Sequence, residues 1–147
     1  MRMLASGGSG AETDRGALGV WVRPPILLIQ LSGFGAEKFA ELIIEDFDQI
    51  MGRKQQAQIF FEMGGMQNYE SGLRTHLTSH FAAHRSQIHS LHVFTRSRLV
   101  SMGVAVANLA LGGLITTHEE RASFHAALDA AAVSSRIMGL SSAALAP

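Results

Sequence analysis

The chain has 147 residues and a mass of 15.8 kDa, which fits one domain with its own hydrophobic core. Apolar residues make up 47% of the sequence, and this share excludes a wholly disordered chain. Lys plus Arg number 12 and Asp plus Glu number 12, so the sequence lacks the basic excess of a general nucleic-acid binder.

The N-terminal segment, residues 1–16, contains the Gly/Ser-rich run Ser6–Gly10 and has no apolar stretch long enough for a secretory signal. We therefore expect residues 1–16 to form a flexible tail. The absence of cysteine excludes disulfides and thiolate metal sites, and it fits a cytoplasmic protein. The longest apolar stretch, Leu99–Ile115, is shorter than the about 20 residues of a membrane span, so we expect no such span.

Two strands are predicted after this tail. Residues 17–22 alternate weakly until the Arg23-Pro24-Pro25 run, and paired prolines are excluded from a central strand, which favours a sheet edge. Ile26–Leu31 is a continuous apolar run of strand length, and the glycines that follow it end the strand.

Helical and strand periodicities then alternate along the chain. Four large apolar residues recur on one helical face before the next turn, namely Phe39, Ile43, Phe47 and Ile50. The pattern predicts a helix at residues 36–51, a strand at 57–63 and a loop at 64–68. A second helix is predicted at 69–86 and a further strand at 89–95.

The helix predicted at residues 98–111 is apolar nearly all round, which indicates burial or an interface. A short strand follows at 114–116. Thr117 and Glu120 form the T-x-x-E pattern of a capping box, which predicts a last helix from this point to about Val133. Residues 134–147 are small and weakly patterned, and we expect a C-terminal tail there.

Strands that alternate with helices indicate βαβ units and a largely parallel sheet. We therefore predict a single α/β domain over residues 17–133. Its sheet has four to five mostly parallel strands with an N-terminal edge strand, and about four helices cover it.

Three stretches of the sequence resemble the STAS family of bacterial anti-sigma-factor antagonists. Ile26–Phe34 resembles the family's opening strand and the glycine turn after it. Residues 59–63, their loop and Glu70–Leu73 resemble the strand, loop and helix start that carry the family's Asp-Ser-Ser-Gly-Leu phosphorylation motif. Leu99–Ile115 stands where the family has its third helix and last strand. The pattern looks closest to divergent STAS-like proteins, whose fold approaches that of lipid-binding Sec14-type domains.

The resemblance implies a non-catalytic regulatory module that binds a protein partner, an anti-sigma-factor or kinase-like protein, under phosphorylation control. Ser71 falls at the phosphoacceptor position, whereas Tyr69 and Glu70 replace the family's Asp and its Ser or Thr. A helix start offers free N–H groups to a phosphate, although an ordinary first-turn serine or N-cap is the simpler interpretation of Ser71. The candidate partner surface comprises Tyr69, Glu70, Gly72, Leu73, Met102 and Val106.

The apolar helix at residues 98–111 leaves other functions open. Its excess of apolar surface fits a partner or a second copy of the chain, the wall of a pocket for an apolar small molecule or lipid, or a face covered by the C-terminal helix. A ligand-binding module of the STAS/Sec14-like kind is therefore the alternative function.

Seven histidines are the remaining unusual feature. His76, His80 and His84 recur at helical spacing, but a metal would need a further ligand from another element, so a solvated face is the simpler interpretation. We expect no metal, no cofactor and no enzymatic activity. An enzyme would bring two or more histidines within hydrogen-bond reach of each other, from the set His76, His80, His89, His92 and His118.

Overall fold

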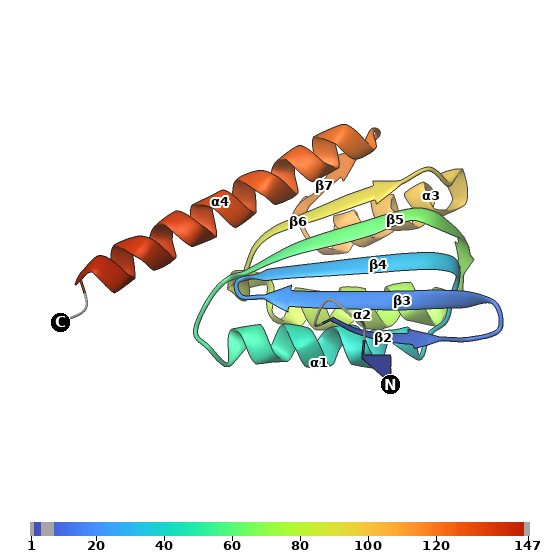
Figure 1. Cartoon of the computed structure of the whole chain (residues 1–147). Coiled ribbons are helices and arrows are strands. Elements are labelled where there is room, and N and C mark those ends of the chain that lie inside the picture. Colours follow the sequence, from blue (N-terminus) through green and yellow to red (C-terminus); the bar gives the residue numbers. More distant parts are fainter. Residues whose placement is uncertain (1, 4–7, 146–147) are drawn as a thin grey trace.

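A seven-stranded sheet forms the centre of the computed structural model, which describes the backbone of residues 2–3 and 8–145 and the side chains of residues 8–135. The strands lie side by side in chain order (Figure 1), as β1 (Arg2–Met3), β2 (Ser9–Glu12), β3 (Gly16–Arg23), β4 (Ile26–Gly35), β5 (Ala57–Tyr69), β6 (Ile88–Thr95) and β7 (Ile115–His118). Strands β1 to β4 pair antiparallel, and β4 to β7 pair parallel.

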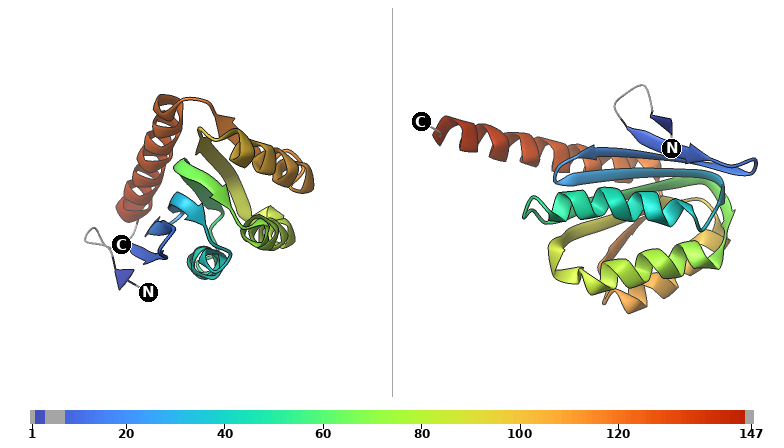
Figure 2. Two further views of the ribbon diagram at one scale, coloured as in Figure 1. Left: turned by 90° about the vertical axis from the view of Figure 1, so that its right-hand side faces the viewer. Right: turned by 90° about the horizontal axis from the view of Figure 1, so that it is seen from below.

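The four α-helices cover the two faces of the sheet unequally. Each parallel connection runs through one helix, namely α1 (Phe39–Met51), α2 (Ser71–Ala83) and α3 (Arg98–Ala110), because parallel strands need a crossover. Figure 2 shows these three helices on one face and α4 (Arg121–Leu145) on the other. The C-terminal part of α4 projects past the sheet (Figure 1).

The α/β class and the four helices are confirmed, but the sheet has more strands than predicted and is mixed rather than mostly parallel. The strand predicted at the edge, β3, lies between β2 and β4, because β1 and β2 add to the sheet beyond it. Residues 1–16 are not a tail throughout, because Ser9–Glu12 form β2 and pair with β3. The glycines that indicate flexibility have a packing role here. A Cβ on Gly8 would come within 2.7 Å of the Trp21 ring, so only glycine lets the chain approach β3 this closely.

The loop predicted at residues 64–68 is wrong, because β5 continues through it to Tyr69. Strand β4 extends in parallel with it, and Ser32 and Gly33 pair with Gly65 and Met66 after a register shift. Met66 is buried, so this extension has a core residue that a glycine-based loop prediction overlooks.

The capping box predicted at Thr117 and Glu120 is also wrong. Thr117 lies in β7, and α4 begins at Arg121. The helix continues to Leu145, past the predicted end at Val133 and through most of the predicted tail. Alanine has the highest helix propensity, so an alanine-rich segment stays helical without a strong apolar period.

The main core lies between the sheet and helices α1 to α3. The apolar face predicted for α1 is fully buried, and the Phe47 ring meets the Phe81 ring of α2 edge to face with centroids 5.2 Å apart. A smaller cluster lies on the α4 side, where Phe124 packs against Phe60 and Phe94. Because this second cluster is small, the docking of α4 depends strongly on Phe124.

We expect Phe124→Ala to lower the free energy of unfolding by about 3–5 kcal/mol, the usual cost of removing a buried phenyl ring. Urea unfolding measures this change. Val133→Ala is the control, because Val133 is exposed on the same helix and should change stability by less than about 0.5 kcal/mol. A loss for Phe124→Ala as small as that of the control would contradict the described docking of α4.

Candidate functional site

An apolar cavity of about 90 Å³ lies between α2, α3 and the sheet. Its walls come from strands β4 to β7 and from the facing sides of the two helices. Only three polar side chains line it, Tyr69, Arg74 and Thr78. The cavity therefore has the composition of a site for an apolar ligand with a polar end.

Helix α3 forms one wall of this cavity with its buried face. Its buried positions are Val100, Gly103, Val104 and Ala107. A Cβ on Gly103 would overlap the hydroxyl of Tyr69, and it would stand 3.3 Å from Cδ of Arg74. Gly103 is thus the position that lets Tyr69 and Arg74 lie against α3.

The opposite side of α3 carries large exposed apolar side chains, which we call the α3 stripe: Leu99, Met102, Val106 and Leu109. Their exposed fractions run from 50% for Leu99 to 84% for Leu109. The spacings of three, four and three residues place them on one helical face. Met102 and Val106, predicted as partner-surface residues, therefore do lie on the surface.

The predicted phosphoacceptor Ser71 is the first residue of α2, and its side chain is exposed. Glu70 precedes it, and its Oε1 accepts a hydrogen bond from the Glu37 N–H at 3.2 Å. A Cβ on Gly72 would overlap the carboxylate of Glu37, so this carboxylate lies directly over the first turn of α2. The positive end of the helix dipole is thus next to two carboxylates.

The structure brings only part of the predicted partner surface together. Tyr69 is half-buried and Leu73 is buried, and both line the cavity. Glu70 and Ser71 are exposed at the start of α2, whereas Met102 and Val106 are exposed on α3. Tyr69 links the two groups, because it ends β5 directly before Glu70 and contacts α3 at Gly103.

No protein-family model matches the chain. A search of curated proteins finds no match either. Among solved structures, the chain is similar to an uncharacterized protein from the DUF3478 family with a SpoIIAA-like fold, from Shewanella loihica PV-4. The TM-score is 0.56 at 11% sequence identity, over 79% of this chain and 95% of that chain.

The fold is SpoIIAA-like.

This finding confirms the STAS-like architecture that the sequence predicts. At this low sequence identity it concerns the fold and not the activity. In the SpoIIAA-like fold of this chain, Ser71 lies at the start of the helix after β5, as the resemblance implies. No helix in the described part of the chain is long and apolar enough to cross a membrane.

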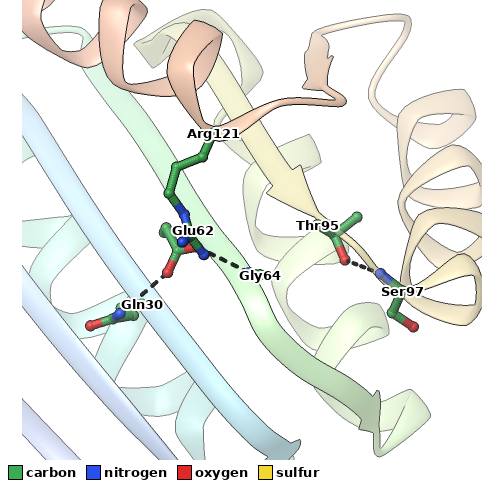
Figure 3. Close-up of polar contacts among 6 residues, drawn as sticks. All are labelled: Gln30, Glu62, Gly64, Thr95, Ser97 and Arg121. Carbon is green, nitrogen blue, oxygen red and sulfur yellow. Dashed lines mark hydrogen bonds and ion pairs between the residues drawn. The ribbon is translucent and has the colours of Figure 1, made fainter.

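The other face of the SpoIIAA-like sheet carries a polar cluster around Glu62 of β5 (Figure 3). Its Oε1 accepts hydrogen bonds from the Gly64 N–H and from Nη2 of Arg121, both at 3.1 Å. Its Oε2 accepts from Nε2 of Gln30 at 3.2 Å. These bonds tie the first residue of α4 to the centre of the sheet.

His76 and His80 lie on α2, and His84 directly follows this helix. His80 pairs with Asp48 of α1 at 2.8 Å, and Nδ1 of His84 donates to the carbonyl oxygen of His80 at 2.9 Å. Among residues whose placement the structure describes, no group of three or more potential ligands could hold a metal ion.

Two other histidines do come together, His92 of β6 and His118 of β7. Nδ1 of His92 lies 2.9 Å from Nε2 of His118, and Nδ1 of His118 lies 2.8 Å from Oγ of Ser123. Ser123 donates its hydroxyl proton to the Glu120 carbonyl oxygen at 3.1 Å. Nδ1 of His118 therefore donates to Ser123, and a neutral His118 can accept at Nε2 from Nδ1 of His92.

The surroundings of this pair favour the neutral rings. Burial lowers the pKa of His92, and the neighbouring His118 lowers it further. Burial also lowers the pKa of His118. The His92 ring stacks on Phe60 with centroids 4.8 Å apart. The pair meets the distance expected of catalytic histidines, but a hydroxyl that donates to a carbonyl is not activated as a nucleophile.

The sequence names His92 and His118 among the candidate histidines but does not indicate that these two pair, and no sequence signal marks Arg74 as a cavity-lining residue or Glu62 as the centre of a polar cluster. His92 and His118 lie on neighbouring parallel strands, and their contact depends on a strand register that the sequence does not determine. In this register His92 is opposite Thr116, and His118 is opposite Phe94. The apolar character of residues 98–111 was the one signal that led to the cavity wall.

We expect stability to fall as the pH drops below about 6.5, the ordinary histidine pKa. The unfolded chain then binds protons that the folded His92 and His118 do not, because their folded pKa values are lower. The loss of stability begins near the histidine pKa of the unfolded chain and is complete below the pKa values of His92 and His118 in the folded chain. Urea unfolding at pH about 7.5 and about 5.5 measures it.

The matched variants are His118→Gln and His89→Gln. His118→Gln removes one titrating ring and removes the neighbour that lowers the pKa of His92. The difference in the free energy of unfolding between the two pH values should therefore shrink. His89 is exposed on β6, and its replacement should leave the difference unchanged. Equal pH dependence in wild-type and His118→Gln protein would show that the pair does not titrate as described.

Proposed function

We propose that the protein is a non-catalytic regulatory module that binds a protein partner through the α3 stripe. The observation that supports this function is the exposure of four large apolar side chains on one helical face. Contiguous apolar surface of this kind is typical of protein interaction sites. The SpoIIAA-like fold supports the proposal by analogy only.

A second copy of the chain is the partner that the α3 stripe fits best. Its spacing of three, four and three residues is the same in both directions. Two antiparallel copies of α3 would therefore place Leu99 opposite Leu109 and Met102 opposite Val106. A twofold interface needs this self-complementarity, since the same patch serves both subunits.

The charge of α3 fits the same arrangement. Arg98, its first residue, is the one charged residue of this helix. In an antiparallel pair Arg98 would lie beside the C-terminal end of the other α3, where the helix dipole is negative and a cation is stabilising. No like charges would meet along the stripe.

We expect the wild-type protein to form a dimer, measured by sedimentation velocity over a range of concentrations. Val106→Glu should weaken it at least tenfold, because the dimer would bury a charge, and a tenfold change corresponds to about 1.4 kcal/mol. Val133→Glu is a close control, because Val133 on α4 is 51% exposed and Val106 is 53% exposed.

Each outcome of this experiment decides something. A wild-type monomer at every concentration would reject the second copy as the partner. A dimer that both variants weaken equally would place the interface elsewhere. A monomer that loses a co-purifying protein in the Val106→Glu variant would reject the second copy but retain the α3 stripe as the binding surface, and mass spectrometry of that protein would test whether it is an anti-sigma-factor or kinase-like partner.

Phosphorylation of Ser71 is the regulation that we propose for this surface. The side chain is exposed at a helix start, which supports modification, and Tyr69 connects this start to α3. A phosphate would add about −1.5 to −2 charges. The added charge would repel the carboxylates of Glu37 and Glu70 and change the surface that a partner meets.

We expect protein purified from its own cells to carry one phosphate by intact-mass analysis, and Ser71→Ala to remove it. Ser79→Ala, a change at an exposed serine on the same helix, is the control. A phosphate that persists in Ser71→Ala, or none in growth and in stress, would contradict this regulation.

The second candidate function is the binding of an apolar small molecule in the cavity. The cavity itself favours it, since its walls are almost wholly apolar. At about 90 Å³ it is smaller than the about 150 Å³ apolar cavity that admits benzene. In this conformation it therefore suits a ligand portion of a few carbons rather than a full lipid chain.

A further inference from the structure

We propose that the cavity between α2, α3 and the sheet binds a small apolar carboxylate, whose charged group is held by the guanidinium of Arg74. This inference deepens the second candidate function and rests on it. It assigns the ligand's two ends, the apolar end to the cavity and the anionic end to Arg74.

The observation that points to an anion is the state of Arg74. Its Nε is buried and has no hydrogen-bond partner. Arg74 also forms no ion pair with any of the residues that the structure describes. A buried N–H group without an acceptor is unfavourable, and a guanidinium is satisfied best by an oxyanion.

The position of Arg74 connects this group to the cavity. Arg74 is one of the three polar side chains in the lining, and its Cδ lies close to Gly103 of α3. The hydroxyl of Tyr69 lies at the same glycine. One oxyanion at this point could therefore accept hydrogen bonds from both Arg74 and Tyr69.

The size of the cavity defines the apolar end. A cavity of about 150 Å³ admits the six carbons of benzene, so 90 Å³ corresponds to about four carbons. Val104 and Ala107 of α3 and Leu77 of α2 all line this space. A short branched chain fills such a compact space better than a long straight chain.

The charge of the site favours a carboxylate over a phosphate. A planar guanidinium matches a carboxylate with two parallel hydrogen bonds. One cation neutralises a monoanion, whereas a phosphate dianion would retain an unpaired charge beside an apolar wall, which is unfavourable. The chemical class is thus a monocarboxylic acid with a tail of about four carbons.

The experiment compares 3-methylbutanoate, 3-methylbutan-1-ol and acetate as probes of the full chain by isothermal titration calorimetry. We expect 3-methylbutanoate to bind at least tenfold more tightly than the alcohol, which lacks the charge, and than acetate, which lacks the tail. Arg74→Met should remove the preference for the acid. Arg53→Met changes an exposed arginine in the turn after α1, outside the cavity lining, and should leave the preference for the acid unchanged.

Ala107→Leu provides a second variant, because it fills the cavity without changing Arg74. It should abolish binding of both branched probes. If Ala107→Leu does not fold, the half-exposed Arg74→Met still decides the question.

The outcomes separate this inference from the function on which it rests. Equal binding of acid and alcohol, unaffected by Arg74→Met, would overturn the carboxylate assignment and retain an apolar pocket. Binding of acetate as tight as that of 3-methylbutanoate would show that the apolar tail adds no affinity and that the cavity does not take part in binding. No binding of any probe would overturn both the inference and the second candidate function.

Discussion

The division of residue sizes on α3 determines most of the candidate site. Its buried positions include the small residues Gly103 and Ala107 beside Val100 and Val104, and its large exposed apolar residues are Leu99, Met102, Val106 and Leu109. Small residues let the helix approach Tyr69 and α2 closely but leave space beneath, which is the cavity. Large residues on the other side produce the exposed stripe. The cavity and the α3 stripe thus lie on opposite sides of one helix.

This division also explains how the two candidate functions relate. A ligand in the cavity would contact α3 from within, and a partner would contact it from outside. Both would act on one helix of 13 residues that contains a single charge. Tyr69 contacts the same helix at Gly103 and continues directly into Glu70 and Ser71, so the start of α2 is physically connected to it.

The sequence predicts the parts of this fold that repeat a simple period, and misses those that depend on close approach. Phe39, Ile43, Phe47 and Ile50 follow the helical period, and all are buried as predicted. The glycine-rich stretches near Gly8 and Gly64 read as flexible, although glycine there makes room for Trp21 and for Arg121. Thr117 and Glu120 match a cap, yet strand pairing of Thr117 with Val93 prevails.

The candidate site shows the same limit. Exposure of Met102 and Val106 follows from an apolar pattern that exceeds what one core contact can bury. The sequence does not reveal that Nε of Arg74 is buried without a hydrogen-bond acceptor. This state depends on the positions of all the acceptor groups around it in the folded chain. The His92–His118 contact depends on the register of β6 and β7, which the hydrophobic period of the sequence does not specify.

The strand order of the sheet has a consequence for solubility. Because the strands lie in chain order, both outer edges consist of short strands, β1 with two residues and β7 with four. A protein with no net charge has little electrostatic repulsion between its molecules. Short edges offer few unpaired backbone groups to a neighbouring sheet, so the geometry of the edges provides protection against aggregation that charge does not.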